Sequence, residues 1–377
     1  MLIDERVLEL IRALNDAGHD AYLVGGCVRD SVRGSTPVDW DVATSATPDE
    51  SKHALHAFTT HDTGLRHGTI TAVCGGMPVE VTTFRVDGEY ADHRRPNAVT
   101  FTRELADDLA RRDFTINAMA YHPDRGLIDL HGGQADLQRR VIRAVGDADA
   151  RLTEDALRIL RALRFASQLD FRVEPSLADS IRRKCELLRM ISAERVRSEL
   201  CKLLLGAGVK RVTREFPEPL RVVLGAEPHA VEGERLEERV ATLTLNTDAD
   251  AILRRLRFSN ADARSIRRVR SIMSDDGTAV ELLLRYGDAD AVRRSLRLRD
   301  ALGEPVAATL AELDALLADG RCFTLARLAV DGGDAVRLGL SGKAVGNALQ
   351  ATLEAVAHGA LPNERDSLLQ ALTQWQA

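Results

Sequence analysis

Two carboxylates that stand two residues apart, Asp39 and Asp41, carry the most specific chemical signal in the sequence. The residues around them predict a strand over 38–43, and side chains two apart on a strand lie on one face. Two carboxylates on one face repel each other unless a cation lies between them. Such oxygen ligands suit Mg²⁺, which takes one or two carboxylates together with the phosphates of a substrate.

A glycine pair upstream supplies a second part of the same chemistry. Gly25 and Gly26 end a short apolar strand predicted over 21–24 and lead into a helix predicted over 27–32. Glycine lets the backbone approach a polyphosphate, and amides at a helix N-terminus favour anions. A solvated surface pair or an ordinary turn would explain either motif alone. Their combination, among apolar β-like residues, indicates metal-dependent nucleotidyl transfer.

The elements that must position these motifs follow from the hydrophobic pattern. Apolar residues at helical spacing predict a helix over 2–17. Thr47 has the type and position of a helix N-cap. Two strands are predicted over 68–74 and 77–84, joined by a glycine pair. On the second strand Glu80 is either a third carboxylate aimed at the metal ions or an ordinary salt-bridged or solvent-facing residue.

Beyond this hairpin the pattern changes twice. The polar segment 85–97 predicts a loop, which is followed by helical spacing over 104–109 and an edge strand over 126–130. From about residue 142 strand signals nearly vanish, and helical patterns continue to the end. Arginine runs recur on these predicted helices, as over 267–270, and they are either solvated faces or a track for an RNA backbone.

Composition sets outer limits on function. The 377 residues are 45% hydrophobic and 29% charged, and the net charge is −6. The protein as a whole therefore lacks the excess of positive charge that is typical of proteins that bind nucleic acid. A local basic stripe on an acidic protein can still hold phosphates. The five cysteines form no CxxC pair, and free thiols in a reducing compartment are the expected state. No signal pattern or membrane-length apolar run is present, so we expect a cytoplasmic protein.

The stretches LVGGCVRDSVRG and DWDVATSATPDE resemble the head of the bacterial class II tRNA nucleotidyltransferases, the CCA-adding enzymes grouped with bacterial poly(A) polymerases. GLRHGTITAV, VEVTTFR, RRDFTINAMA and EDALRILRALRFA extend the resemblance over the first half of the chain, and LSGKAVGNALQ is a weaker match near the C-terminus. The resemblance implies an α+β protein: a polymerase β-like nucleotidyltransferase head with a mixed β-sheet, followed by an all-helical neck, body and tail. We expect the boundaries 1–140, 141–205, 206–300 and 301–377, with tRNA bound by the tail.

The resemblance also implies roles for individual residues. Asp39 and Asp41 would be catalytic and hold two Mg²⁺ ions, with Glu80 as a possible further ligand. Asp30 would orient an arginine or metal-bound water. Asp113 with Arg112 would recognise the ribose hydroxyls, unless the charged trio is a structural ion pair. The residues expected to bind the nucleotide are Gly25, Gly26, Arg29, Asp30, Arg111, Arg112, Asp113, Glu154, Asp155, Arg158, Arg161 and Arg164.

Selection between bases is predicted from the stretch 153–169, expected as one helix with Thr153 as its cap. Asp155 accepts hydrogen bonds and Arg158 only donates them. Cytosine and adenine each present an amino donor beside a ring-nitrogen acceptor, and the pair satisfies both. Uracil and guanine reverse both groups and are rejected. The alternative is a plain i,i+4 ion pair between Glu154 and Arg158.

The resemblance therefore predicts template-independent addition of C, C and A to the 3′ end of tRNA from CTP and ATP. A poly(A) polymerase or an A-adding partial enzyme of the same family is the alternative. The intact segment 85–97, which in the family is a flexible loop that helps the site move from C to A, argues against a CC-only relative. A non-catalytic RNA-binding protein is a further alternative, and the intact Asp39/Asp41 pair argues against it. No His-Asp dipeptide occurs in the helical half, which excludes an added phosphohydrolase domain.

Overall fold

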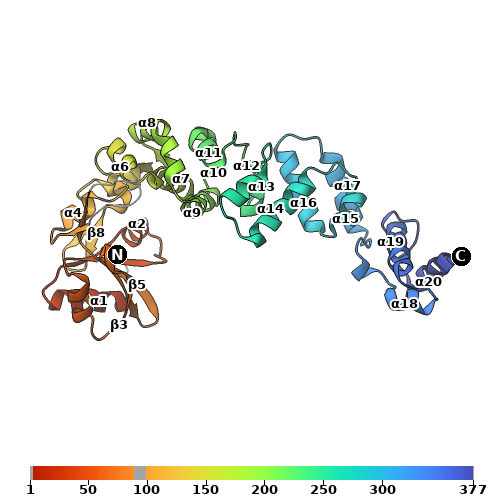
Figure 1. The fold of residues 1–377 in the computed structure, drawn as a ribbon, viewed down its shortest axis with the longest axis horizontal. Helices are drawn as coiled ribbons and strands as arrows, with labels where there is room; N and C mark the ends of the chain where they lie inside the picture. The colour runs from red at the N-terminus through yellow and green to blue at the C-terminus, as the bar shows by residue number, and fades with distance from the viewer. Residues whose placement is uncertain (1–2, 89–98, 377) are drawn as a thin grey trace. The chain divides into compact units, whose positions relative to one another are not determined.

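The computed structural model describes residues 3–88 and 99–376, and its N-terminal part is built on a mixed sheet (Figure 1). The seven strands run in the order β3-β4-β5-β2-β1-β8-β9. The strands are β1 (Ala21–Val24), β2 (Trp40–Thr44), β3 (Thr59–Gly64), β4 (Thr69–Cys74), β5 (Met77–Thr83), β8 (Ala120–His122) and β9 (Gly126–Ile128).

Strand pairing places the two chemical motifs side by side at the centre of this sheet. β1, which ends at the glycine pair, pairs antiparallel with β2, which carries Asp41. β2 pairs parallel with β5, and that register sets Asp41 opposite Glu80. β4 and β5 form the predicted hairpin, and the alternation of buried and exposed residues along β4 is what a strand with one buried face requires. The edge strand expected over 126–130 is confirmed as β9.

Short helices surround the sheet. The helix expected over 2–17 is α1, which begins after its N-cap Asp4 and buries four apolar residues. Thr47 caps α3 as predicted, in a reciprocal capping box with Glu50. The helices and 3₁₀ turns of this part are α1 (Glu5–Asp16), α2 (Gly26–Val32), α3 (Pro48–Ala54), η1 (Leu65–His67), α4 (Leu105–Ala110), η2 (Thr115–Asn117) and α5 (Gly133–Arg139).

The structure differs from the prediction at one strand boundary, at two strands that were not predicted, and in part of the predicted loop. β2 begins at Trp40, so Asp39 lies just before the strand and not within it. β3 and β8 were not predicted, because β3 is a polar edge strand and β8 lies inside the apolar FTINAMAY stretch. The segment 85–97 was expected to be a loop, but its first residues form β6 (Arg85–Asp87), paired with β7 (Val99–Phe101). Residues 89–97 of that predicted loop lie outside the described residues.

The rest of the chain is helical except for a two-residue parallel pair, β10 (Val141–Ile142) with β11 (Arg172–Val173). The first group of helices is α6 (Ala148–Glu154), α7 (Leu157–Gln168), α8 (Pro175–Lys184), η3 (Cys185–Met190), α9 (Ala193–Leu204), α10 (Val209–Glu215) and α11 (Pro217–Leu224). The second group is α12 (Leu236–Leu243), α13 (Ala249–Arg255), α14 (Asn260–Met273), α15 (Ala279–Tyr286), α16 (Ala289–Ala301), α17 (Ala307–Ala318), η4 (Leu325–Arg327), α18 (Gly332–Arg337), α19 (Lys343–Ala357), α20 (Arg365–Thr373) and η5 (Gln374–Gln376).

The single helix expected over 153–169 is interrupted, which corrects the predicted cap. Thr153 lies in the last turn of α6, where its hydroxyl donates to the carbonyl of Asp149. Asp155 ends α6 with an extended backbone, φ −131° and ψ 102°. Its carboxylate accepts a hydrogen bond from the backbone amide of Leu157, 3.0 Å away, at the start of α7. A local side-chain bond of this kind competes with helical hydrogen bonding and explains the break.

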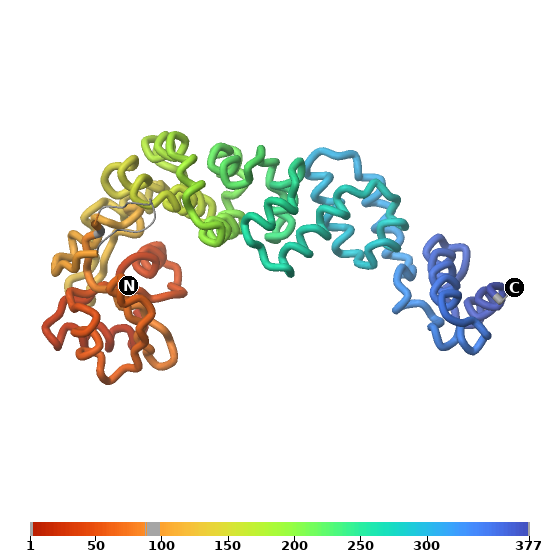
Figure 2. The backbone as a smooth tube through the Cα atoms, viewed as in Figure 1, coloured from red at the N-terminus to blue at the C-terminus, as the bar shows by residue number. Residues whose placement is uncertain are grey.

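The chain divides into two compact units, and Figure 2 traces the backbone of both. The first contains Met1–Pro228 with Arg254–Arg257, and the second contains His229–Leu253 with Phe258–Ala377. The first unit holds the whole sheet and the helices α1 to α11. In the second unit, residues of α14 to α17 enclose one apolar cluster and residues of α18 to α20 enclose another. Among the described helices, none is both long and apolar enough to cross a membrane.

Candidate functional site

A polar pocket of about 560 Å³ in the first unit gathers most of the predicted site residues. It lies where the glycine turn, the start of β2, η2 and α7 meet. Twelve predicted residues line it: Gly25, Gly26, Arg29, Asp39, Asp41, Arg111, Arg112, Asp113, Asp155, Arg158, Arg161 and Arg164. Three lining residues were not predicted: Asn117, Phe165 and Lys202. Three predicted residues do not line it: Asp30, Glu80 and Glu154.

The glycine turn brings backbone against the carboxylate strand. Gly25 has φ 74° and ψ −130°, a conformation that side chains rarely allow. A Cβ atom at this position would lie 3.3 Å from Arg112 Nη1 and 3.6 Å from Asp41 Oδ2. Glycine is therefore required both by the backbone and by the space between two charged groups that face the pocket.

Asp41 is a carboxylate in an environment that disfavours its charge. Burial, followed by the neighbouring charges of Glu80 and Asp39, raises the pKa of Asp41 to about 6, although Arg112 acts in the opposite direction. A divalent cation would relieve this cost, because it favours the ionised form. Within residues 3–88 and 99–376, no group of three or more His, Cys, Asp or Glu side chains is arranged to hold a metal ion. The protein thus offers the Asp39–Asp41 pair, which fits a Mg²⁺ ion that takes its remaining ligands from phosphates and water.

Glu80 and Asp30 lie outside the pocket lining. Glu80 is exposed on β5 and acts on Asp41 through its charge. Asp30 accepts two hydrogen bonds from Arg29, each 2.9 Å long. Asp30 therefore orients an arginine, which is one of the two roles expected for it.

Each member of the charged trio before FTINAMAY forms an ion pair, as the alternative interpretation expected, and each partner lies outside the trio. Arg111 and Arg112 both bind the fully buried Asp108, at 2.7 and 2.9 Å. Burial raises the pKa of Asp108, but the two guanidinium groups outweigh it and the net shift is downward. Both arginines are thereby held against the pocket by one internal carboxylate.

Asp113 joins the head to α7. Its carboxylate lies 2.6 Å from the Arg161 guanidinium, and this pair outweighs the effect of burial and lowers the pKa of Asp113 to about 2. Asn117 links the pair to the glycine turn: its amide donates to Asp113, and its carbonyl oxygen accepts a hydrogen bond of 2.8 Å from Arg29. A motif search could not identify Asn117, because its partner Arg29 is 88 positions away in sequence.

The side chains of the two predicted base-selecting residues share the pocket, and each has a different ion-pair partner. The Asp155 carboxylate lies 3.2 Å from Arg195 of α9. Arg158 Nη1 donates to Glu154 at 2.7 Å and to the carbonyl of Arg151 at 3.1 Å. Arg158 Nη2 donates to the carbonyl of Arg111 at 3.0 Å. The Glu154–Arg158 ion pair expected in the alternative interpretation is therefore present, and it holds Arg158 in place across the helix break.

Phe165 of α7 is the centre of a cationic cluster in the pocket lining. The guanidinium carbons of Arg164, Arg29 and Arg161 lie 4.0, 5.2 and 5.6 Å from the centre of its ring. Arg164 also pairs with Glu199 of α9 at 2.6 Å, and burial lowers the pKa of Arg164. Arg161 and Arg164 share α7 with Phe165, whereas Arg29 reaches the ring from α2, a contact that no local pattern in the sequence reveals.

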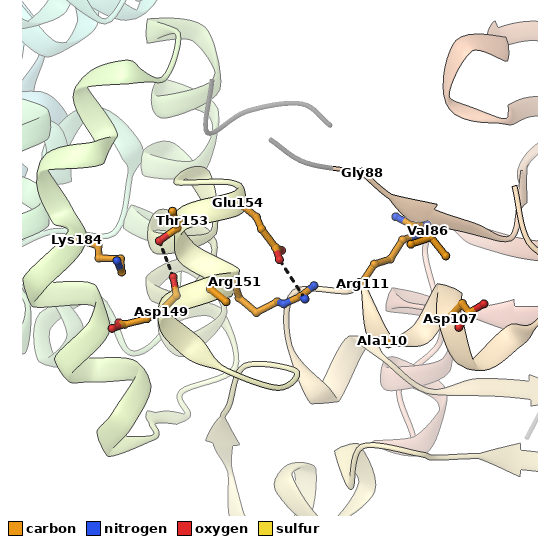
Figure 3. Close-up of a pocket in the computed structure, with 11 residues that line it drawn as sticks. Val86, Gly88, Asp107, Ala110, Arg111, Asp149, Arg151, Thr153, Glu154 and Lys184 are labelled. Atoms are coloured by element: carbon orange, nitrogen blue, oxygen red, sulfur yellow. Dashed lines mark hydrogen bonds and ion pairs between the residues drawn. The ribbon is translucent and has the colours of Figure 1, made fainter. Parts of the chain in front are cut away.

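Taken together, the pocket lining contains seven cationic side chains and four carboxylates. That excess of positive charge suits a polyanion such as a triphosphate. A neighbouring pocket of about 790 Å³, shown in Figure 3, has a more apolar lining that includes Val86, Ala110 and Ala150. Glu154 lies on this second pocket, paired with Arg151 at 3.1 Å, and Arg111 lines both pockets.

Three protein-family models match successive parts of the chain. A model of the poly A polymerase head domain matches residues 21–143. A model of the RNA- and SrmB-binding site of polymerase A matches residues 170–215. A model of tRNA nucleotidyltransferase domain 2 matches residues 237–372. The three matches together follow the chain from the sheet to α20.

Curated relatives and solved structures agree with these matches. The CCA-adding enzyme of Levilactobacillus brevis is 50% identical over 202 residues, which is 54% of this chain and 50% of that enzyme. The CCA-adding enzyme of Lactobacillus delbrueckii subsp. bulgaricus is 36% identical over 400 aligned positions and 97% of each chain. The crystal structure of the Bacillus stearothermophilus CCA-adding enzyme in complex with CTP superposes with a TM-score of 0.75 at 31% identity, over 99% of this chain and 97% of that one. A Thermotoga maritima CCA-adding enzyme complexed with tRNA, at 20% identity and a TM-score of 0.73, shares the fold.

Proposed function

The chain belongs to the family of CCA-adding enzymes, and we propose that it adds C, C and A to the 3′ end of tRNA from CTP and ATP without a nucleic-acid template. The observation that carries the proposal is the pocket itself. It brings the Asp39–Asp41 pair, the Gly25–Gly26 turn and the Asp155 and Arg158 side chains into one cavity of about 560 Å³. A nucleoside triphosphate has the matching parts in the same order: phosphates, ribose and base.

The reaction is a displacement at the α-phosphorus of the incoming nucleotide. The 3′-oxygen of the RNA forms a bond to phosphorus and its proton passes to solvent. The bond from phosphorus to the bridging oxygen breaks, and that oxygen leaves with the electron pair as part of pyrophosphate. Arg29 faces the glycine turn, and we assign it and the Phe165 cluster to the triphosphate.

We propose two Mg²⁺ ions as cofactors, held by Asp39 and Asp41. When bound, Mg²⁺ lowers the charge on the phosphates and makes the RNA 3′-hydroxyl a better nucleophile. The raised pKa of Asp41 supports this assignment, because a buried carboxylate beside two others is unfavourable without a cation. Glu80 stays a candidate for a further ligand through its position opposite Asp41 in the sheet.

Base selection is proposed for Asp155 and Arg158. Asp155 is held by Arg195 and Arg158 by Glu154, so both groups are fixed before a nucleotide arrives. The described contacts of Arg158 use both hydrogens of Nη1 and one of Nη2, so the Nε–H and a second Nη2–H can serve a base. Asp113, Arg161 and Arg112 line the same pocket, and we propose that they meet the ribose.

We propose that the helical remainder binds the tRNA, with residues 301–377 as its tail, and that the protein works in the cytoplasm. Some of the predicted arginine runs serve the fold instead. Arg270 donates to the carbonyls at the end of α12, and Arg299 is buried between Asp276 and Glu304. Arg297, which is exposed and belongs to the same run as Arg299, can bind an RNA phosphate.

The test uses purified protein and a tRNA that ends at its discriminator base, with each NTP supplied alone and then together, and products resolved to one nucleotide. We expect CTP alone to add two residues, CTP with ATP to complete CCA, and UTP or GTP to add nothing. A long A ladder would instead identify a poly(A) polymerase. Binding of tRNA without any addition would leave an RNA-binding protein and contradict the proposal.

A further inference from the structure

One cation in the pocket lining differs from the others in its pairing. Each of the six arginines has a carboxylate partner between 2.6 and 2.9 Å away: Asp30, Asp108, Glu154, Asp113 or Glu199. Lys202 of α9 is exposed and, among the residues that the structure describes, forms no ion pair. The arginines are thus fixed by the protein, whereas the Lys202 ammonium is free to meet an anion that enters the pocket.

Two packed helices, α7 and α9, show which end of the pocket Lys202 occupies. At one end Asp155, beside the base-selecting Arg158, pairs with Arg195. Further along both helices Arg164 pairs with Glu199. Lys202 follows Glu199 by three residues, so it lies one turn beyond this second pair on the same face of α9.

That second end is the phosphate end. Arg164 stacks on Phe165, and Arg29 reaches the same ring from the glycine turn. The separation along α9 also fits. Lys202 follows Arg195 by seven positions on α9, and at 1.5 Å per residue this is about 10 Å of helix. A nucleotide bound with its base beside Asp155 therefore extends its terminal phosphates toward Lys202.

We propose that Lys202 binds the β- and γ-phosphates of the incoming nucleotide and then the pyrophosphate that they become. This inference rests on the proposed nucleotidyl transfer. As the bond to the α-phosphorus breaks, the bridging oxygen keeps the electron pair and negative charge grows on the leaving group. An unpaired ammonium on a flexible stem can follow that charge, while the paired arginines stay in place. Lys202 is a binding residue for the leaving group and donates no proton in this scheme.

The same chemistry would also suit a phosphate of the RNA backbone near its 3′ end, and the experiment separates the two sources. The full chain with Mg²⁺ is titrated with pyrophosphate, CTP and CMP, and single-turnover addition is measured against tRNA concentration. The variants are Lys202→Ala, Lys202→Arg and, as a charge-matched control, Lys52→Ala. Lys52 lies on α3 outside the pocket, paired with Asp62 at 2.6 Å.

We expect Lys202→Ala to weaken binding of pyrophosphate and CTP about tenfold, as loss of a charged hydrogen bond does. CMP affinity and the tRNA concentration at half-maximal rate should not change. Lys202→Arg should restore most of the pyrophosphate affinity, and Lys52→Ala should match the wild type.

Unchanged pyrophosphate affinity in Lys202→Ala would overturn the proposal, and a raised tRNA requirement in that variant would assign the lysine to RNA. Equal losses for CMP and CTP would also overturn it, because the contact would then not be to the terminal phosphates. A wild-type protein that neither binds CTP nor extends tRNA would contradict the proposed function itself, which is a separate result.

Discussion

Asp41 and Asp113 are two carboxylates of one pocket whose pKa values shift in opposite directions. Burial and neighbouring carboxylates raise the pKa of Asp41 to about 6, whereas Arg161 outweighs burial and lowers that of Asp113 to about 2. Asp113 has its counter-charge within the protein, at 2.6 Å. Asp41 has no such ion pair among the described residues. The side of the pocket with Asp39 and Asp41, the sheet side, therefore lacks counter-charges and suits cations. The side with Asp113 and Arg161, the helical side, is held in place by ion pairs within the protein.

The largest expected effect is a loss of activity on the sheet side of the pocket, where Asp39 and Asp41 would bind metal ions. Asp39→Ala or Asp41→Ala should lower nucleotide addition by roughly 10²–10³-fold, which is the usual cost of removing one group that stabilises developing charge. Circular dichroism should show an intact fold. Near wild-type turnover with Mg²⁺ in either variant would remove the metal assignment.

On the helical side of the pocket, removing a carboxylate should lower the stability of the fold. Asp113→Asn leaves Arg161 without its partner, and breaking a buried ion pair costs about 3 kcal/mol or more. The stabilisation by Asp113 is present above the unfolded-state pKa and is lost as pH falls through about 2. Urea denaturation at pH 7 measures the loss. A difference below about 0.5 kcal/mol would show that the pair does not hold α7 to the head.

Asp41→Asn should change stability in the opposite direction. The folded-state pKa of Asp41 is raised, so the protonated form stabilises the fold at low pH and this contribution is lost as pH rises through about 6. At pH 8 without divalent ions the asparagine variant should be more stable than the wild type by about 2–3 kcal/mol. The gain should disappear below about pH 4. If Mg²⁺ stabilises the wild type and the variant equally, Asp41 is not a ligand.

The sequence predicted the sheet side of the pocket more completely than the helical side. Gly25, Gly26, Asp39 and Asp41 lie close together in the chain, so a short pattern contains most of the site. The helical side depends on long-range pairs, such as Asp113 with Arg161, 48 positions apart. No local pattern reveals such a partner, and the ion-pair alternative therefore named no partner for Asp113.

The secondary-structure errors have equally local causes. β3 was missed because it is a polar strand at the edge of the sheet, where no alternation of buried residues is required. The break between α6 and α7 was missed because hydrophobic spacing continues through it, while the carboxylate of Asp155 replaces a helical hydrogen bond. The separation of Asp155 from Arg158 is a result of this break, and it leaves each residue with its own support.

The central claim is that Asp155 and Arg158 select C and A, and competition kinetics with all four NTPs test it most directly. Arg158→Ala should reduce the preference for CTP and ATP over UTP and GTP about ten- to a hundredfold in relative kcat/KM, since a lost bidentate-type contact is worth roughly 1–3 kcal/mol. Arg172→Ala, at an exposed position of β11 outside the pocket, should leave the preference unchanged. An Arg158→Ala enzyme that is slower or less stable but equally selective would contradict the claim, and Arg158 would then serve only its ion pair with Glu154.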